Sequence, residues 1–179
     1  RSVVTFIGEP EKVIEAAFNM TKIASRLIDM RTHIGGHPRM GATDVIPFTP
    51  VSNVTIDECV EVAKEVGAEI GSWGIPVYLY EDAATRPERR NLAAIRKGQY
   101  EGFFEKIKQE DWKPDYGPQE MNVKSGGTVV GARVPLVAYN INLDTPDVEI
   151  ADKIAKTIRH IGGGLRYVKA IGLKLEERN

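Results

Sequence analysis

Three stretches of the chain repeat their apolar residues at the spacing of an α-helix, and short apolar runs typical of strands separate them. The first stretch runs from Pro10 to Met30, the second follows Thr55, and the third follows Pro146. Each has one apolar stripe, as a helix that lies on a sheet requires. The stripes consist of Val13, Ala17, Met20, Ala24, Leu27 and Ile28; of Ile56, Val60, Ala63, Val66 and Ile70; and of Val148, Ile150, Ala151, Ile154, Ala155 and Ile158. The chain is therefore expected to pack helices against a sheet.

The expected strands indicate the kind of sheet. Pro47 and Pro50 remove two backbone donors from the second of them, which should be an edge strand or one with an irregular end. The same prolines argue against a doubly wound parallel sheet, whose central strands donate to a neighbour on each side. We expect an α+β fold of ferredoxin-like (split βαβ) subdomains, with helices packed on a mixed, largely antiparallel sheet. The strands are residues 3–7, 44–51, 75–80, 129–143 and 165–175.

Side chains at two helix starts provide capping signals. Thr55 and Glu58 have the spacing of a capping box ahead of the second helix. Thr145 is expected to cap the third helix, with Pro146 in its first turn. Both helices should therefore begin at well-defined positions.

Two segments between the expected strands are irregular. Gly98 and Gly102 should break residues 86–109 into two short surface helices. Residues 111–127 contain glycines and prolines without any period, and an irregular segment of this length is more often functional than filler. Within it, residues 117–126 have the composition of a ligand-binding loop.

The composition argues against several classes of protein. Lys and Arg number 24 against 25 Asp and Glu, and the formal net charge of −1 gives no general basis for binding nucleic acid or an anionic membrane. No apolar run is long enough to span a bilayer and no signal peptide is evident, so we expect a cytoplasmic protein. The single cysteine, Cys59, excludes an internal disulfide and should be a small apolar helix residue. Arg1 leads into a strand pattern without a methionine, which suggests that sequence precedes it.

A loop rich in histidine and glycine is the strongest candidate for a site. Residues 33–44 hold two of the three histidines, one arginine and three glycines. Pro38 restricts His37 to extended backbone geometry, while Gly35 and Gly36 should leave one side of the ring open. A histidine can take and give a proton near neutral pH. His37 is therefore either a catalytic group or a solvated loop histidine.

Other polar residues of this loop also have two interpretations. Arg39 is either a bidentate clamp for a substrate carboxylate or half of a surface ion pair. Asp44 either orients the histidine or caps a turn. His33 is either a second site group or a histidine stabilised by the negative end of the preceding helix. His160, near the end of the third helix, has the second explanation.

A metal site is not expected in this loop. His33 and His37 are four residues apart, but two glycines between them argue against a helix, and no acidic motif such as H-E-x-x-H accompanies them. The glycines do not form a phosphate loop either, because neither G-x-x-x-x-G-K-[ST] nor a helix-opening G-x-G-x-x-G is present.

A series of different short motifs is spread over nearly the whole chain. They are residues 24–30 (ASRLIDM), 37–42 (HPRMGA), 77–80 (VYLY), 94–98 (AIRKG), 112–118 (WKPDYGP), 131–133 (GAR) and 139–143 (YNINL). In this order they resemble the glutamate formiminotransferases, the folate-dependent enzymes of histidine breakdown. Several ordered motifs are more specific than one short pattern.

The resemblance implies two ferredoxin-like subdomains, with the substrates held in the groove between them. The boundary would fall near Leu136, so that residues 1–136 form the N-terminal subdomain and residues 137–179 the start of the C-terminal one. Members of the family carry a strand and a helix upstream of the position of Arg1, including an acidic residue proposed for the site. Animal members add a cyclodeaminase domain that this sequence does not contain.

The resemblance also implies site residues. His37 matches the catalytic histidine, and Arg39 and Asp44 beside it are our candidates for substrate binding. Lys124 and Ser125 differ from the animal pattern of the folate-binding stretch. That stretch would comprise Gly117, Pro118, Gln119, Glu120, Met121, Asn122, Val123, Lys124, Ser125 and Gly126.

The activity implied is transfer of a formimino group from N-formimino-L-glutamate to N5 of the co-substrate tetrahydrofolate, in a homodimer without a metal. N5 loses a proton as it attacks, and the glutamate nitrogen gains one as it leaves, so His37 can serve both steps as general acid/base. Formyl transfer from N-formylglutamate is a related alternative. A non-catalytic folate-binding module is an alternative from another class. Neither nucleic acid nor a membrane is an expected partner.

Overall fold

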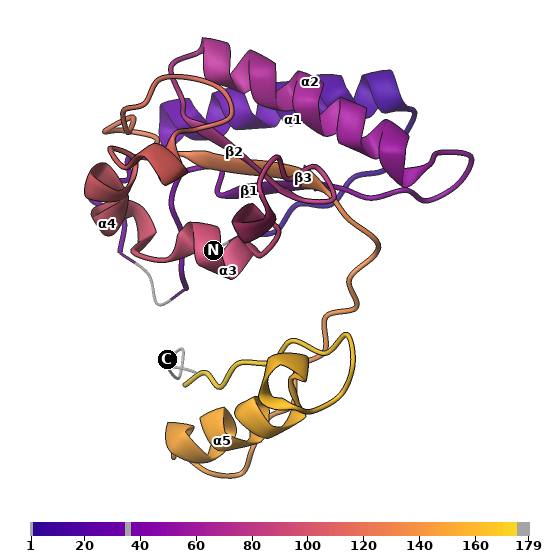
Figure 1. Ribbon diagram of the computed structural model, residues 1–179, viewed down its shortest axis with the longest axis vertical. Helices are drawn as coiled ribbons and strands as arrows, with labels where there is room; N and C mark the ends of the chain where they lie inside the picture. Colours follow the sequence, from indigo (N-terminus) through magenta and orange to yellow (C-terminus); the bar gives the residue numbers. More distant parts are fainter. Residues whose placement is uncertain (1, 35–36, 175–179) are drawn as a thin grey trace. The chain divides into compact units, whose positions relative to one another are not determined.

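A computed structural model describes residues 2–34 and 37–174 of the chain. It divides into two compact units, residues 1–135 and residues 136–179 (Figure 1). The first unit contains a sheet and most of the helices, and the second is built around one helix. The first unit comprises α1 (Pro10–Leu27), β1 (Val45–Phe48), α2 (Ile56–Ser72), β2 (Val77–Glu81), η1 (Pro87–Arg89), α3 (Leu92–Arg96), α4 (Gln99–Lys106), η2 (Glu110–Trp112) and β3 (Thr128–Ala132). The second comprises α5 (Val148–Ile158) and η3 (His160–Gly162).

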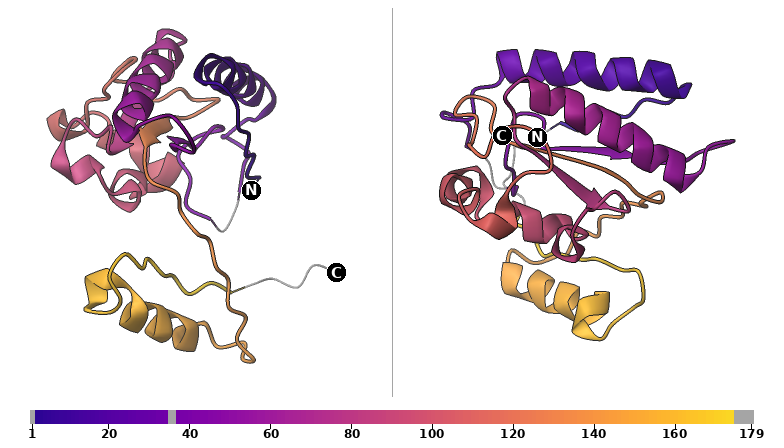
Figure 2. Two further views of the ribbon diagram at one scale, coloured as in Figure 1. Left: turned by 90° about the vertical axis from the view of Figure 1, so that its right-hand side faces the viewer. Right: turned by 45° about the horizontal axis from the view of Figure 1, so that its top comes forward.

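The first unit has helices on both faces of its sheet. Side chains alternate along a strand between the two faces, so neighbouring residues of β2 pack in different layers. Val77 and Leu79 pack in the core that contains α1 and α2. Tyr78 and Tyr80 pack in the other core, with Ile95, Tyr100 and Phe103 of α3 and α4. Figure 2 shows α1 and α2 over one face of the sheet, and α3 and α4 on the opposite side.

The sheet differs from the expected mixed, largely antiparallel one. Its strands run in the order β1-β3-β2, and both pairs are parallel. A parallel pair requires a crossover connection, and helices provide it: α2 lies between β1 and β2, and α3 and α4 lie between β2 and β3. The α+β prediction holds at the coarse level of helices packed on a sheet, but the antiparallel prediction is wrong for the strands that the structure describes.

Pro47 lies where an edge strand can accommodate a proline. It is part of β1, which is at the edge of the sheet and, among the described strands, has β3 as its one neighbour. An edge strand tolerates a missing donor because one of its sides needs none. The edge-strand prediction is confirmed, whereas the argument from the same prolines against parallel pairing was wrong.

Three expected strand segments are not strands in the structure. Residues 3–7 and 133–143 have no strand assignment and are largely exposed, and β3 ends at Ala132. Residues 165–174 are also irregular, while the end of that prediction, Leu175, lies outside the described residues. A strand needs a neighbour for its backbone groups, and these segments are not paired in a sheet in the part of the chain described. The prediction of strands here rested on apolar composition alone, which does not show whether a neighbouring strand is present.

The helices follow the sequence patterns more closely. α1 begins at Pro10 as expected but ends at Leu27, three residues before the expected end at Met30, and α2 follows its predicted cap at Thr55. The capping box is confirmed by hydrogen bonds from the Glu58 backbone N–H to Thr55 Oγ1 (3.2 Å) and from the Thr55 N–H to Glu58 Oε2 (2.7 Å). Gly98, with φ of +94°, separates α3 from α4 as predicted. Gly102 lies inside α4, so the second predicted break is wrong.

The N-cap of α5 lies two residues after the expected cap, Thr145. Asp147 is the N-cap, and its carboxylate accepts from the Glu149 N–H at 2.9 Å. Thr145 instead accepts a hydrogen bond from the Asp147 N–H at 3.2 Å, so it supports the cap from outside the helix. An ionised carboxylate is a stronger acceptor for a helix N-terminus than a hydroxyl.

Within the described ranges, no helix combines the length and apolarity needed to cross a membrane. Cys59 is buried on α2 as a free thiol, and burial raises its pKa. It is part of the core, as its position on the helix stripe predicted.

Candidate active site

His37 lies in the loop that connects α1 to β1. Its ring is partly buried, and Nδ1 is 2.8 Å from the carbonyl oxygen of Pro38. A carbonyl only accepts, so this contact favours the tautomer in which Nδ1 carries the proton. Nε2 is then left with a lone pair that can accept a proton. The expectation that Gly35 and Gly36 leave one side of the ring open concerns residues outside the described ones.

Arg39 is bound within the protein. Its guanidinium donates to both carboxylate oxygens of Glu101, at 2.7 and 3.0 Å, and to Gln99 Oε1 at 3.0 Å. It also donates to the backbone carbonyl of His33 at 2.9 Å. This hydrogen-bonded ion pair raises the pKa of Arg39 and lowers that of Glu101. Arg39 therefore connects both sides of the histidine loop to the first turn of α4.

Asp44 holds the backbone at the end of the same loop. Its Oδ1 accepts from the Met40 N–H at 2.9 Å, and its Oδ2 is paired with the guanidinium of Arg96 in α3. Both contacts are within the protein, and neither partner is His37. Of the two interpretations, the contacts fit the turn-stabilising role.

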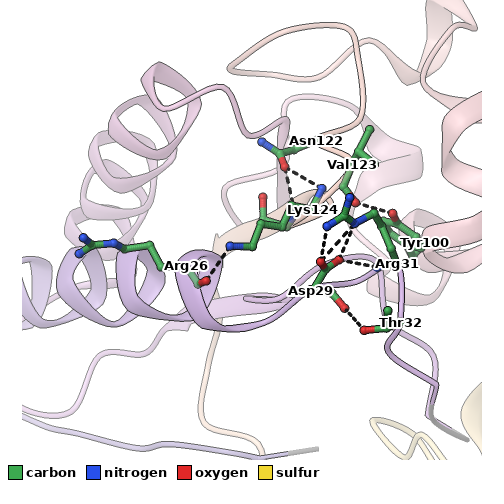
Figure 3. A network of polar contacts seen from close by, with 9 residues as sticks. Arg26, Asp29, Arg31, Thr32, Tyr100, Asn122, Val123 and Lys124 are labelled. Atoms are coloured by element: carbon green, nitrogen blue, oxygen red, sulfur yellow. Dashed lines mark hydrogen bonds and ion pairs between the residues drawn. The ribbon is translucent and has the colours of Figure 1, made fainter.

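The stretch 117–126 contains a compact turn (Figure 3). Asn122 Oδ1 accepts from the backbone N–H of Lys124 at 3.1 Å and of Ser125 at 3.0 Å, and the Asn122 carbonyl accepts from the Gly126 N–H at 2.7 Å. Gly126 has φ of +73°, and a Cβ there would lie 2.2 Å from the Met40 carbonyl oxygen. Only glycine fits this position without displacement of the backbone.

The histidine loop and the turn at 122–126 are directly bonded to each other. The Ala42 N–H donates to the Ser125 carbonyl at 2.8 Å, and the Gly127 N–H donates to the Met40 carbonyl at 3.0 Å. The Met30 N–H donates to the Lys124 carbonyl at 2.8 Å. The structure thus brings together two segments that are more than 80 residues apart and that were predicted separately as parts of a site.

Two further contacts, drawn in Figure 3, fix the middle of the turn. Lys124 Nζ donates to the Arg26 carbonyl at the end of α1, at 2.7 Å, and the Tyr100 hydroxyl of α4 donates to the Val123 carbonyl at 2.6 Å. A lysine that binds the last carbonyls of a helix also interacts favourably with the helix dipole. The turn therefore joins elements from both faces of the sheet.

The predicted folate-binding residues do not form one uniform surface. Gly117, Pro118, Gln119 and Glu120 are exposed, and Gln119 donates to the Ile107 carbonyl at 3.1 Å. Met121 is buried in the core with α3 and α4. Asn122, Lys124 and Ser125 line an open pocket of about 710 Å³, together with Lys22, Ser25, Arg26, Trp73 and Ile75.

The irregular segment before this stretch is anchored by a buried ion pair. Arg89 donates to Asp115 Oδ2 at 2.8 Å and to the carbonyls of Lys113 (2.6 Å) and Asp111 (3.0 Å). Asp115 also accepts from the Leu79 N–H at 2.8 Å. The pair is nearly inaccessible, with 1% and 9% of the two side chains exposed.

Several of these residues were not foreseen from the sequence. Gln99 and Glu101 lie about 60 positions from Arg39, and no local pattern relates them. Lys22, Arg26 and Trp73 were not predicted as site residues, because the pocket that they line forms only when α1, α2 and the turn pack together. Among the described residues, no three or more His, Cys, Asp or Glu side chains lie together in a cluster suited to a metal.

The fold and the site define an α+β protein in which a histidine loop is bonded to a glycine-containing turn beside an open pocket. Residues 1–133 match the family model of the formiminotransferase domain, N-terminal subdomain. The chain belongs to the formiminotransferase family. It is 57% identical to glutamate formimidoyltransferase of Streptococcus pyogenes serotype M1 and 48% identical to that of Thermoplasma acidophilum, over all of this chain and 60% of each relative. It is 49% identical to formimidoyltransferase-cyclodeaminase of Rattus norvegicus, over all of this chain and 34% of that protein. The chain thus spans about 60% of the length of its microbial relatives.

Proposed function

We propose that the protein transfers a formimino group from N-formimino-L-glutamate to N5 of tetrahydrofolate. One observation carries the proposal: in a chain of this family, the His37 loop is bonded through backbone groups to the turn of the stretch 117–126. The loop that carries His37, our candidate for proton transfer, and the predicted folate-binding segment are therefore held together by hydrogen bonds. The names of the microbial relatives, glutamate formimidoyltransferase, support the same reaction.

In this proposal His37 moves the protons. Nε2 accepts the proton that N5 loses as it attacks the formimino carbon, and returns it to the glutamate nitrogen as the carbon–nitrogen bond breaks. The contact between Nδ1 and the Pro38 carbonyl supports this role, because it keeps Nε2 available as the acceptor. General acid–base catalysis of this kind contributes roughly 10²- to 10⁴-fold to a rate.

Arg39 and Asp44 receive revised roles in the proposal. The sequence suggested that they bind substrate, but the guanidinium donates to Glu101, Gln99 and the His33 carbonyl, and the carboxylate of Asp44 binds Met40 and Arg96. We assign both to positioning of the loop that carries His37. Tetrahydrofolate would be held by the polar part of the stretch that lines the pocket, Asn122, Lys124 and Ser125.

We also propose that residues 1–136 and 137–179 belong to two ferredoxin-like subdomains of a cytoplasmic homodimer. The division into compact units at residues 135 and 136 and the match of the family model to residues 1–133 support the boundary. In this arrangement α1 and α2 would be the helix layer of the ferredoxin-like subdomain, and α3 and α4 on the opposite face of the sheet would be additions to it. Size-exclusion chromatography with light scattering tests the dimer.

Turnover of N-formimino-L-glutamate with tetrahydrofolate by the full-length protein tests the function. We expect His37→Ala to lower kcat by at least about 10²-fold, because the proton transfer is lost. His160→Ala, the same substitution at an exposed histidine of the second unit, is the matched control and should keep wild-type activity. Full activity of His37→Ala would refute the assignment of the histidine, and turnover of N-formylglutamate alone would replace the formimino donor by a formyl donor.

A further inference from the structure

An open pocket of the first unit is lined by three cations and by no carboxylate. Its lining residues are Lys22, Ser25, Arg26, Trp73, Ile75, Asn122, Lys124 and Ser125. Lys22 and Arg26 are four residues apart on α1, so their side chains lie on one face of the helix. Lys124 reaches the same place from the turn, because its Nζ donates to the Arg26 carbonyl.

Two of these cations have no anionic partner in the part of the chain that the structure describes. Within residues 2–34 and 37–174, no carboxylate pairs with Lys22 or Arg26, whereas Lys12 on the same helix pairs with Glu15 at 3.1 Å. Lys22 lies over the ring of Trp73, 5.8 Å from its centroid. Lys124 uses one of its three N–H donors on the helix end and retains two. The pocket therefore has unneutralised positive charge beside an aromatic wall.

The positive groups of this pocket are side chains and not free backbone N–H groups, which favours carboxylates over phosphate as ligands. Phosphate sites are commonly built from successive backbone N–H groups. Here the N–H groups of Lys124 and Ser125 already donate to Asn122 Oδ1, so positive side chains provide the available donors. A guanidinium matches a carboxylate with two parallel hydrogen bonds, and separate ammonium groups can meet a second carboxylate.

We propose that this pocket binds the two carboxylates of a glutamyl group. The inference rests on the proposed function, in which both reactants end in such a group: N-formimino-L-glutamate is itself a glutamyl dicarboxylate, and tetrahydrofolate has one attached to its aminobenzoyl ring. Arg26 takes one carboxylate, and Lys22 with Lys124 takes the other. Trp73 and Ile75 supply the apolar wall for the carbon chain.

Calorimetric binding to the full-length protein and to its Arg26→Gln and Lys22→Gln variants tests this inference. Three ligands are compared: tetrahydrofolate, tetrahydropteroate, which has the same rings without the glutamyl group, and N-formimino-L-glutamate. Lys12→Gln is the matched control, since it makes the same change of charge on α1 at a side chain that is 79% exposed. Thermal unfolding confirms that each variant folds.

Each variant is expected to bind one of the two glutamyl ligands roughly tenfold more weakly, as loss of a hydrogen bond to a charged group does. Lys12→Gln should leave the affinities unchanged. If the pocket holds the glutamyl end of tetrahydrofolate, the variants bind tetrahydrofolate more weakly and bind tetrahydropteroate as the wild type does. If the pocket holds the donor, only the binding of N-formimino-L-glutamate weakens. Equal binding of both glutamyl ligands to variants and wild type would overturn this inference alone, and so would equal losses for tetrahydrofolate and tetrahydropteroate. Failure of the unmodified protein to bind either reactant would overturn the proposed function and this inference with it.

Discussion

Arg39 has the contacts of a residue that fixes the geometry of a loop. Substitution by lysine keeps the charge but loses the fork that binds Glu101, Gln99 and the His33 carbonyl together. Displacement of a catalytic group by about 1 Å can lower a rate roughly 10²-fold. We therefore expect Arg39→Lys to lower kcat by about that factor while KM for the donor changes less than about threefold.

Steady-state kinetics with both substrates separates this role from direct substrate binding. Arg90→Lys, at an exposed arginine that pairs with Asp82, is the matched control and should not alter kcat. A large rise in KM at constant kcat would instead identify Arg39 as a substrate clamp.

Two glycines allow a direct comparison of backbone constraint. An alanine at position 126 would have a positive φ and a Cβ 2.2 Å from the Met40 carbonyl oxygen, which we expect to cost about 2–4 kcal/mol in the free energy of unfolding. Gly102 lies within α4, and its added Cβ would meet no atom within 4 Å. Gly102→Ala should therefore stabilise the protein by about 0.5–1 kcal/mol.

Urea unfolding of the two alanine variants measures both effects. The contrast matters for the site, because Gly126 is where the turn meets the histidine loop. Equal stability of the two variants would mean that the close approach of these segments is not required.

At the scale of elements, the irregular segment 111–118 depends on one buried ion pair. Removal of one partner of such a pair costs about 3–5 kcal/mol, because the other charge remains buried. We expect Arg89→Met to lose this amount of unfolding free energy, since Asp115 would keep only part of its hydrogen bonds. Arg90→Met, at the next residue with an exposed side chain, should change it by less than about 0.5 kcal/mol. Chemical denaturation of both variants checks the difference.

The turn after α1 should make stability depend on pH in acid. Hydrogen bonds from Arg31 lower the pKa of Asp29 from 3.8 to about 2 (Figure 3). Because the pKa is lower in the folded state, the contribution of Asp29 is fully present above about pH 4 and is lost as the pH falls toward 2. Asp29→Asn and Arg31→Gln should both flatten the decrease in melting temperature between pH 4 and pH 2. An unchanged slope in both variants would show that this pair does not contribute.

Elements defined by local patterns were predictable, and elements defined by distant partners were not. The helix positions, the capping box at Thr55 and the break at Gly98 depend on residues within a few positions of each other, and the structure has them. The expected stripes are only partly buried, because Leu27 of α1 is 79% exposed and Val148, Ile150 and Ile154 of α5 are also exposed. The direction of the strands depends on which strands pair, and Val129 pairs with both Val45 and Tyr78 across the chain. Apolar composition cannot distinguish such a strand from the exposed residues 3–7.

The candidate site shows the same division. His37 was identifiable because histidine, proline and glycine stand together in the sequence. The contacts that position the loop of His37 could not be predicted, because they join residues far apart in the sequence. Arg39 binds Glu101 across 62 positions, and Lys124 binds the end of α1 across 98 positions. The residues of the cationic pocket come from three segments, and none of these segments has an unusual composition by itself.

At the scale of the whole molecule, the chain between the two compact units should be its most accessible part. Residues 133–147 have no helix or strand and are mostly exposed, and 83% of Tyr139 is exposed. Proteases cut where the backbone is exposed and free of regular hydrogen bonding. We expect brief chymotrypsin treatment of the protein to cut first after Tyr139, and Tyr139→Ser to remove that cut. Tyr78, which is fully buried in β2, is the internal control and should remain uncut. Mass spectrometry of the first fragments identifies the position. A first cut between β1 and β3 would contradict the proposed boundary, because it would place the least protected backbone inside the first unit.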